Sequence, residues 1–123
     1  MFLSLAAPTW SASFMNETLY PPAIPQEHYC GVIDTNLLYE AGIEDFDNAQ
    51  YILCRESGGN PEAQNPNSTA FGLGQLLVAT REAIGCDKRV DPVYQLRCAD
   101  EYTEGRYGSW ASAKAFWLDN NHY

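Results

Sequence analysis

The sequence predicts a single, mainly α-helical globular domain, and three observations lead to this prediction. Several segments have the apolar spacing of helices and are bounded by capping and terminating residues. No segment alternates apolar and polar residues as a half-buried strand does, and the chain contains no internal repeat. With 123 residues, of which 46% are apolar, the chain is long enough to form one core.

The first two helices are predicted before residue 60. One begins at Asp34 or Thr35, either of which can serve as N-cap, and it stops at Gly42. The next begins with Asp47 as its N-cap and ends at the glycine pair 58–59.

Three more helices are predicted in the second half of the chain. A short helix spans residues 80–85. A longer helix starts with Asp91 as N-cap and Pro92 at its first position, and Gly105 is expected just past its end. Ser109 then caps a final helix over residues 110–120.

The four cysteines form an even set without a CxxC pair, and zinc-ligand spacing is absent. Two disulfides therefore explain them better than a metal site, and they place the protein in an oxidising compartment or on a particle surface. Three pairings are possible, and we favour Cys30–Cys54 with Cys86–Cys98 because each bridge closes a local loop. Four buried free thiols in a cytosolic protein are the alternative.

The chain is acidic, with a net charge of −9 that is unevenly distributed. Residues 1–50 contain seven acids and no Lys or Arg, whereas residues 51–123 contain nine acids and seven bases. Such a chain lacks the basic footprint that binds phosphates, so nucleic acid is not an expected partner. No apolar run reaches the ~18–20 residues that span a bilayer, so no membrane span is expected.

Residues 1–26 are expected to form an N-terminal arm and linker in front of a folded domain of residues 27–123. Residues 1–15 are mildly apolar, as in a signal peptide, but they have no positively charged start. The following YPPAIPQ is typical of an extended, proline-rich connector. The arm is therefore interpreted either as a signal or as a structural arm that docks onto a virion or envelope complex.

Glu56 lies in the last turn of the second predicted helix, on an apolar stripe with Ala49, Ile52 and Leu53. A carboxyl group on a buried face is desolvated, and the partial negative charge of the helix C-terminus acts in the same direction. Both effects favour the protonated form, which suits a proton donor near neutral pH. The alternative is a salt-bridged structural carboxylate.

The residues that follow Glu56 have the composition of a sugar-binding site. Residues 60–75 contain Asn and Gln side chains with paired donors and acceptors, and glycines on both sides of Leu73 allow close backbone approach. For the aromatic residues downstream, core packing is the alternative to stacking on sugar faces. These aromatic residues are Tyr102, Tyr107, Trp110, Phe116, Trp117 and Tyr123.

The stretch ESGGNPEAQNPNSTAFGLGQL resembles the signature of the lysozyme-like lytic transglycosylases. That signature is Glu-Ser, two variable residues, Asn-Pro and a short loop to Gly-Leu-x-Gln. The similarity is specific over residues 51–77 and weaker over the rest of residues 28–123, where an RYG turn precedes a final aromatic helix. Many phage tail and virion-associated domains that degrade peptidoglycan carry this signature. The resemblance implies a lysozyme-like fold with a substrate groove.

Carried over by position, the resemblance makes Glu56 the sole catalytic acid and Ser57 a residue that orients its turn. Asn65 stands where the family has a polar residue that reaches the substrate or the catalytic carboxylate. Gln75 ends the Gly-Leu-x-Gln element that lines the groove.

Phe116 and Trp117 fall near an Ala-Tyr-Asn segment of the family, so a tyrosine hydroxyl is missing at this place. Thr69 replaces a glycine that is common in the family's loop. We include Phe116, Trp117 and the aromatic Tyr123 among the residues expected to bind substrate.

The resemblance implies that the partner is a peptidoglycan glycan strand, cleaved at the β-1,4 bond between N-acetylmuramic acid and N-acetylglucosamine. The sugar's own 6-hydroxyl then attacks and leaves a 1,6-anhydro end, and this chemistry requires no metal or cofactor. The expected location is extracytoplasmic or virion-associated, at the cell wall.

Three alternatives stay open. A hydrolase (muramidase) would need a second carboxylate to activate water. A wall-binding or structural module would keep the groove without catalysis, and in a disulfide-stapled interaction domain the signature would be a coincidence. The carboxylates available to a hydrolase are Asp87, Asp91, Asp100 and Glu101.

Overall fold

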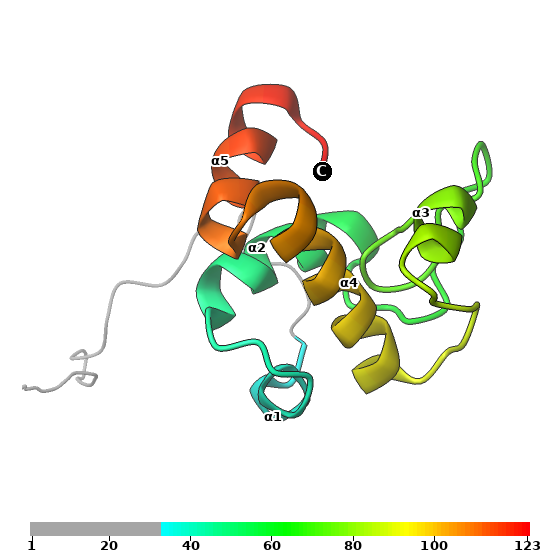
Figure 1. Cartoon of the computed structure of the whole chain (residues 1–123), viewed down its shortest axis with the longest axis horizontal. Coiled ribbons are helices and arrows are strands. Elements are labelled where there is room, and N and C mark those ends of the chain that lie inside the picture. Colours follow the sequence, from blue (N-terminus) through cyan, green and yellow to red (C-terminus); the bar gives the residue numbers. More distant parts are fainter. Residues whose placement is uncertain (1–32) are drawn as a thin grey trace, which may run out of the picture.

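The computed structural model describes residues 33–123, and this part of the chain consists of helices and irregular loops (Figure 1). The prediction of a mainly α-helical fold is confirmed, because the described residues contain no strand beyond two isolated bridges of Phe71 with Gln64 and Leu76. The predicted arm of residues 1–26 lies outside the described residues. The helices are α1 (Thr35–Glu40), α2 (Phe46–Ser57), α3 (Val78–Ala83), α4 (Pro92–Tyr107) and α5 (Trp110–Asn120).

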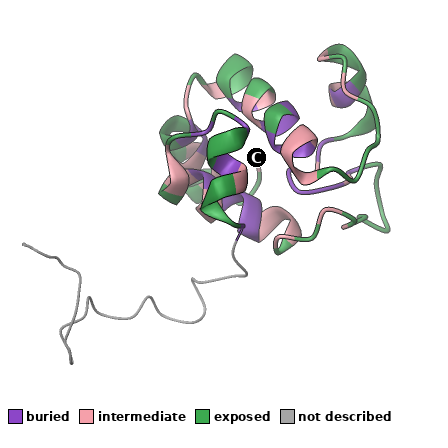
Figure 2. Cartoon of the chain, turned by 90° about the horizontal axis from the view of Figure 1, so that it is seen from below, coloured by how far each residue is buried: buried purple, intermediate pink, exposed green. Residues whose placement is uncertain are grey.

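The helices pack around α4 and α2. α5 contacts both of them, and α1 contacts α4. In Figure 1, α5 lies at the upper left beside α2, α1 lies at the bottom, and the loop between α2 and α3 extends to the right with α3. Buried residues lie on the inward-facing sides of these helices (Figure 2). The fully buried side chains are Leu38, Ile43, Ile52, Leu53, Leu73, Leu96 and Thr103.

The start of α2 differs from the prediction by two residues. Asp45, and not Asp47, is the N-cap, because its carboxylate accepts from the Asn48 backbone N–H at 3.3 Å and from the Asn48 side chain at 2.8 Å. Asp47 instead lies in the first turn, where its negative charge interacts favourably with the positive end of the helix dipole. The earlier start brings Phe46 into the helix, where it packs against the core.

The prediction that Gly105 follows the end of α4 is wrong, since the helix continues to Tyr107 and Gly108 is its left-handed C-cap. Gly105 is an exposed residue inside the helix, where a glycine costs only about 1 kcal/mol relative to alanine, and the helix continues past it. The extra residues place Tyr107 against the core. The predicted caps Asp34, Asp91 and Ser109 are confirmed, as is the end of α2 at Gly58.

The short helix α3 starts at Val78, two residues before the predicted position, and its cap is not local. Leu77 precedes it without a side-chain cap, but the Thr69 hydroxyl accepts from the Val78 backbone N–H at 3.0 Å. Thr69 therefore satisfies an otherwise unpaired donor at the start of α3.

The predicted disulfide Cys86–Cys98 is confirmed, with 6.3 Å between the two Cα atoms. It ties the loop after α3 to the middle of α4. Cys54 is also disulfide-bonded, while its predicted partner Cys30 lies outside the described residues. None of the described helices has the length and apolar character needed to cross a membrane.

We predict that replacing both Cys86 and Cys98 by Ala lowers the free energy of unfolding by about 3 kcal/mol, because the bridge closes a short loop in the unfolded chain. Chemical denaturation of the double variant measures this change. Chemical reduction is a poorer test because it would also open the bridge of Cys54. An unchanged denaturation midpoint would contradict a stabilising role for this bridge.

Candidate active site

Glu56 is the half-buried acid at the end of α2. Ala49, Ile52 and Leu53, which share its face of the helix, are completely buried. The predicted apolar stripe is therefore present, and Glu56 lies where this stripe meets the surface. The position of the carboxyl group follows from helical periodicity, because residues three and four apart lie on one face.

The carboxyl group of Glu56 has a neutral hydrogen-bond partner. Trp117 on α5 donates its indole N–H to Glu56 Oε2 at 3.3 Å, and the two residues are 61 positions apart. The packing of α5 on α2 thus brings them together. Trp117, predicted as a substrate-binding residue, contacts the candidate catalytic carboxyl group itself.

Two opposing effects set the pKa of Glu56. Burial raises the pKa above its ordinary value of 4.5, and the hydrogen bond from Trp117 lowers it by a smaller amount. The net result is a raised pKa. A carboxyl group in this state retains its proton to higher pH than an exposed one, as a general acid requires.

The turn after Glu56 is fixed by Ser57 and Gly58. The Ser57 hydroxyl donates to the Leu53 carbonyl at 3.0 Å and accepts from the Gly59 backbone N–H at 3.2 Å. Gly58 has a φ of 65°, in the left-handed region that glycine adopts readily. Ser57 thus ends the helix and directs the chain into the loop that follows.

The loop after α2 is held against α4 by the side chain of Gln95, which sequence reasoning did not identify. Its Oε1 accepts from the Leu73 backbone N–H at 2.8 Å, and its Nε2 donates to the carbonyls of Pro61 at 2.8 Å and Arg89 at 2.5 Å. One buried amide therefore connects three separate stretches of chain. A Cβ at Gly72 would lie 2.8 Å from Gln95, so the glycine is needed for this close approach.

Gln75, within the loop, and Arg81, on α3, also hold this loop. Gln75 has a φ of 50° and donates its side-chain amide to the carbonyls of Ala63 and Gly72, both at 2.9 Å. The guanidinium of Arg81, which is only 9% exposed, donates to the Leu76 carbonyl at 2.6 Å. The amide N–H groups of Gln75 are thus used by the loop backbone. Its predicted contact with substrate stays a prediction.

Asn65 lies at the exposed tip of the loop. Its side chain accepts from the Asn67 backbone N–H at 2.8 Å, and its own N–H donates to the Ala70 carbonyl at 3.2 Å. These bonds close a local turn and do not bring Asn65 to Glu56. Its predicted role toward substrate or carboxylate stays a prediction.

Tyr123 belongs to an aromatic cluster between α4 and α5. Its ring stacks on those of Tyr107 and Trp110, with centroids 5.8 and 6.0 Å apart. Its hydroxyl bonds the Thr103 hydroxyl, and burial raises the pKa of Tyr123. Phe116 joins the cluster through Tyr107, with centroids 5.3 Å apart. Tyr123 thus packs as a core residue in this structure, and its contact with a sugar stays a prediction.

A cleft lies between α3 and α4, and Tyr102 is among its lining residues whereas Glu56 is not. Burial raises the pKa of Tyr102 to about 12, and the neighbouring Tyr107 adds to the effect. The cleft has a volume of about 430 Å³, within the range of ligand sites. It is lined by Ala79, Thr80, Ala83, Ile84, Glu101, Tyr102, Gly105 and Arg106.

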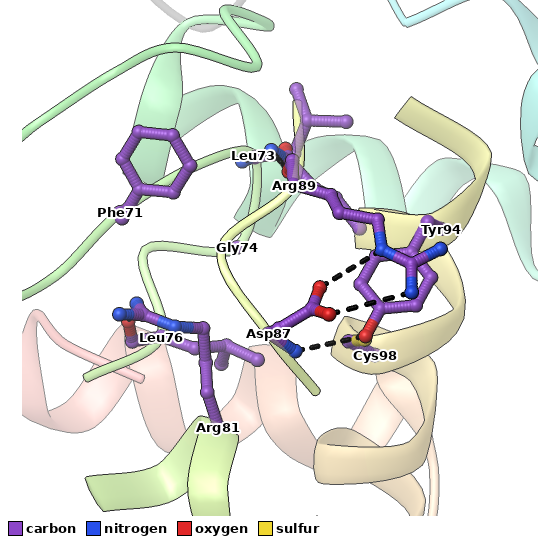
Figure 3. Close-up of a pocket in the computed structure, with 10 residues that line it drawn as sticks. Phe71, Leu73, Gly74, Leu76, Arg81, Asp87, Arg89, Tyr94 and Cys98 are labelled. Carbon is purple, nitrogen blue, oxygen red and sulfur yellow. Dashed lines mark hydrogen bonds and ion pairs between the residues drawn. The ribbon is translucent and has the colours of Figure 1, made fainter. Parts of the chain in front are cut away.

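A second pocket lies where the loop meets α4, and Glu56 is not among its lining residues (Figure 3). Arg89 pairs with Asp87 at 2.9 Å at its rim, and the Tyr94 hydroxyl accepts from the Asp87 backbone N–H at 2.8 Å. Its volume of about 20 Å³ holds a water molecule but no sugar. This pocket is therefore a packing gap beside Gln95.

Over residues 33–123, no group of three or more His, Cys, Asp or Glu side chains is arranged to hold a metal ion. The chemistry available at Glu56 is that of a carboxyl group, an indole N–H and nearby tyrosines.

We predict that Gly72→Ala destabilises the protein more than Gly85→Ala does. Both glycines have positive φ, +83° and +75°, so each alanine costs about 1–2 kcal/mol of backbone strain. Only the Cβ at position 72 also collides with Gln95, whereas the Cβ at position 85 has nothing within 4 Å. Thermal unfolding of both variants measures the difference. An equal decrease in melting temperature for the two variants would show that the Gln95 side chain moves aside without a cost in stability.

We predict that Glu56→Gln becomes progressively more stable than the unsubstituted protein as the pH rises above 4.5. Because the folded-state pKa is raised, the folded protein keeps this proton where the unfolded chain has lost it. The stability gained from the retained proton is full at acidic pH and is lost as the pH rises through the folded pKa. Denaturation at several pH values measures the difference, which should disappear below pH 4.5. A difference that grows toward acidic pH would contradict a raised pKa.

Comparisons with protein-family models, with curated proteins and with solved structures gave no match. The function proposed below therefore rests on the geometry around Glu56 and on the resemblance of residues 51–77 to a known signature.

Proposed function

We propose that the chain is a lytic transglycosylase with a lysozyme-like fold, which cleaves the β-1,4 bond between N-acetylmuramic acid and N-acetylglucosamine in peptidoglycan. The observation that carries the proposal is the state of Glu56. This half-buried acid has a raised pKa, and its hydrogen bond comes from a neutral indole N–H and not from a cation. A structural glutamate at a helix end would be expected to pair with an Arg or Lys.

The first step transfers the proton of Glu56 to the glycosidic oxygen. The C–O bond then breaks, and positive charge develops on the muramyl ring as in other glycosidases. The Trp117 N–H stabilises the carboxylate that Glu56 becomes, because a hydrogen bond to the charged form favours that form. Burial and this hydrogen bond together keep the group able both to release and to recover a proton.

The second step uses the same carboxylate as a base. The muramyl N-acetyl group assists at the ring carbon, and the Glu56 carboxylate removes the proton of the 6-hydroxyl of that sugar. The oxygen attacks the ring carbon and forms the 1,6-anhydro bond, so the proton lost in the first step returns to Glu56. Water is not consumed, and one carboxyl group is sufficient.

The cleft between α3 and α4 is the proposed path of the glycan strand. Its volume of about 430 Å³ is of the size that ligand sites have, and its wall includes the aromatic ring of Tyr102. Glu56 is not among the residues that line this cleft, so the strand has to extend beyond the cleft to reach the carboxyl group. The proposed location is the cell wall, reached from outside the cytoplasm or from a virion.

A muramidase on the same fold is the alternative function, and one observation supports it. Of the four carboxylates available to a hydrolase, Glu101 lines the α3–α4 cleft. The others have other roles: Asp87 pairs with Arg89, Asp91 caps α4, and Asp100 accepts from Trp110. Glu101 is therefore the carboxylate on which the muramidase alternative rests.

We predict that Glu56→Gln lowers the rate of peptidoglycan cleavage by at least ~100-fold, because the amide keeps the shape but cannot donate the proton. Release of soluble muropeptides measures the rate, and co-sedimentation with peptidoglycan should be unchanged. Glu40→Gln, which changes an exposed glutamate on α1, is the control and should keep full activity.

The mass of the released fragments separates the two enzymes. A transglycosylase leaves anhydro ends that are one water lighter than the ends left by a hydrolase. Binding without cleavage by the unsubstituted protein would indicate a wall-binding module, and neither binding nor cleavage would indicate an interaction domain. Either of these last two results would refute the proposed activity.

A further inference from the structure

Two cationic side chains converge on one aromatic ring beside Glu56. The Arg55 guanidinium lies 3.5 Å from the centre of the Tyr51 ring, and the Lys114 ammonium lies 4.5 Å from it. Arg55 and Tyr51 belong to α2, whereas Lys114 belongs to α5. We call these three residues the Tyr51 cation cluster. All three are partly exposed, so the cluster reaches solvent.

The cluster has cationic hydrogen-bond donors that no described residue uses. Arg55 donates one N–H to the Tyr51 carbonyl at 3.1 Å, and a guanidinium has five N–H donors. Lys114 makes no hydrogen bond within residues 33–123. Neither side chain forms an ion pair with a residue of 33–123. The ion pair found among these residues joins Arg89 to Asp87. Within residues 33–123, the two cations of the cluster therefore face solvent with hydrogen-bond donors to spare for a ligand.

The cluster is connected directly to the candidate active site. The Tyr51 ring packs edge-on against Trp117, with centroids 5.9 Å apart, and Trp117 donates to Glu56. The Arg55 guanidinium also lies 5.8 Å from the Trp117 ring. A ligand whose glycosidic bond reaches Glu56 would therefore have its neighbouring groups within reach of the cluster.

We propose that the Tyr51 cation cluster binds a carboxylate of the peptide stem that is attached to the muramyl sugar. This inference rests on the proposed function and adds a specificity to it. Peptide stems carry free carboxylates, whereas the hydroxyl and N-acetyl groups of the glycan are neutral. A guanidinium and an ammonium together bind a carboxylate by charge-assisted hydrogen bonds, and the planar guanidinium can bind both of its oxygens. The Tyr51 ring holds the two cations in place through cation–π contacts.

The test compares native peptidoglycan with peptidoglycan whose stem carboxylates have been converted to neutral amides by carbodiimide and ammonia. Both substrates are first freed of wall phosphate polymers. We expect the unsubstituted protein to show a KM about tenfold lower on the native substrate, the scale of one charge-assisted hydrogen bond. The double variant Arg55→Gln/Lys114→Gln should lose this preference and keep its rate at saturating substrate.

The matched control is Lys88→Gln/Arg97→Gln, which removes two exposed cations elsewhere. Lys88 also lies over an aromatic ring, 4.6 Å from the centre of Phe71, and Arg97 bonds the Glu40 carbonyl on α1. In Figure 1, α1 lies at the far side of the molecule from α5. This control should keep the preference for native peptidoglycan. Thermal unfolding of both double variants shows whether each is folded.

Equal cleavage of the two substrates by the unsubstituted protein would overturn the inference, and so would a preference that survives in Arg55→Gln/Lys114→Gln. A preference that appears only when wall phosphate polymers are retained would assign the cluster to phosphate and overturn the stem assignment. If neither substrate is cleaved, the proposed function fails, and co-sedimentation then tests the cluster alone. Stronger binding to the native substrate that is lost in the double variant would still support carboxylate binding by the cluster. Equal binding to both substrates would overturn it.

Discussion

The candidate site depends on one constraint, which is that Glu56 loses part of its solvent without gaining a cation. The packing of α5 on α2 imposes this state, because it covers the last turn of α2 with Trp117. An indole N–H compensates only part of the desolvation, so the pKa of Glu56 stays raised. A salt bridge at the same place would lower the pKa and remove the proton that an acid catalyst must donate.

A different constraint holds the loop after α2, which has no regular secondary structure to pair its backbone groups. Long polar side chains take over this role: Gln95 from α4, Arg81 from α3 and Gln75 from the loop itself. Each of them bonds backbone groups and not other side chains. The loop backbone that follows Glu56 is therefore tied to helices on two sides without a β-sheet.

The parts of this structure that could be predicted from the sequence are those with local causes. Asp91 and Gly58 act within one helical turn, and the position of Glu56 follows from the period of α2. The parts that could not be predicted depend on contacts between distant residues. Gln95 bonds Pro61 from 34 positions away, and Trp117 bonds Glu56 from 61 positions away, so no local pattern reveals them.

The aromatic side chains beside Glu56 also separate charges that would otherwise cancel. Arg55 follows Tyr51 by one helical turn, and its guanidinium lies on the Tyr51 ring, not on the adjacent carboxyl group. Trp117 stands between the Tyr51 ring and Glu56, and it presents its N–H to the acid. Among residues 33–123, the same two rings thus leave the acid without a counter-ion and hold nearby cations whose donors are not all used. Under the proposed function, these cations offset the negative net charge of the chain, which would otherwise repel a negatively charged substrate group from the surface around the acid.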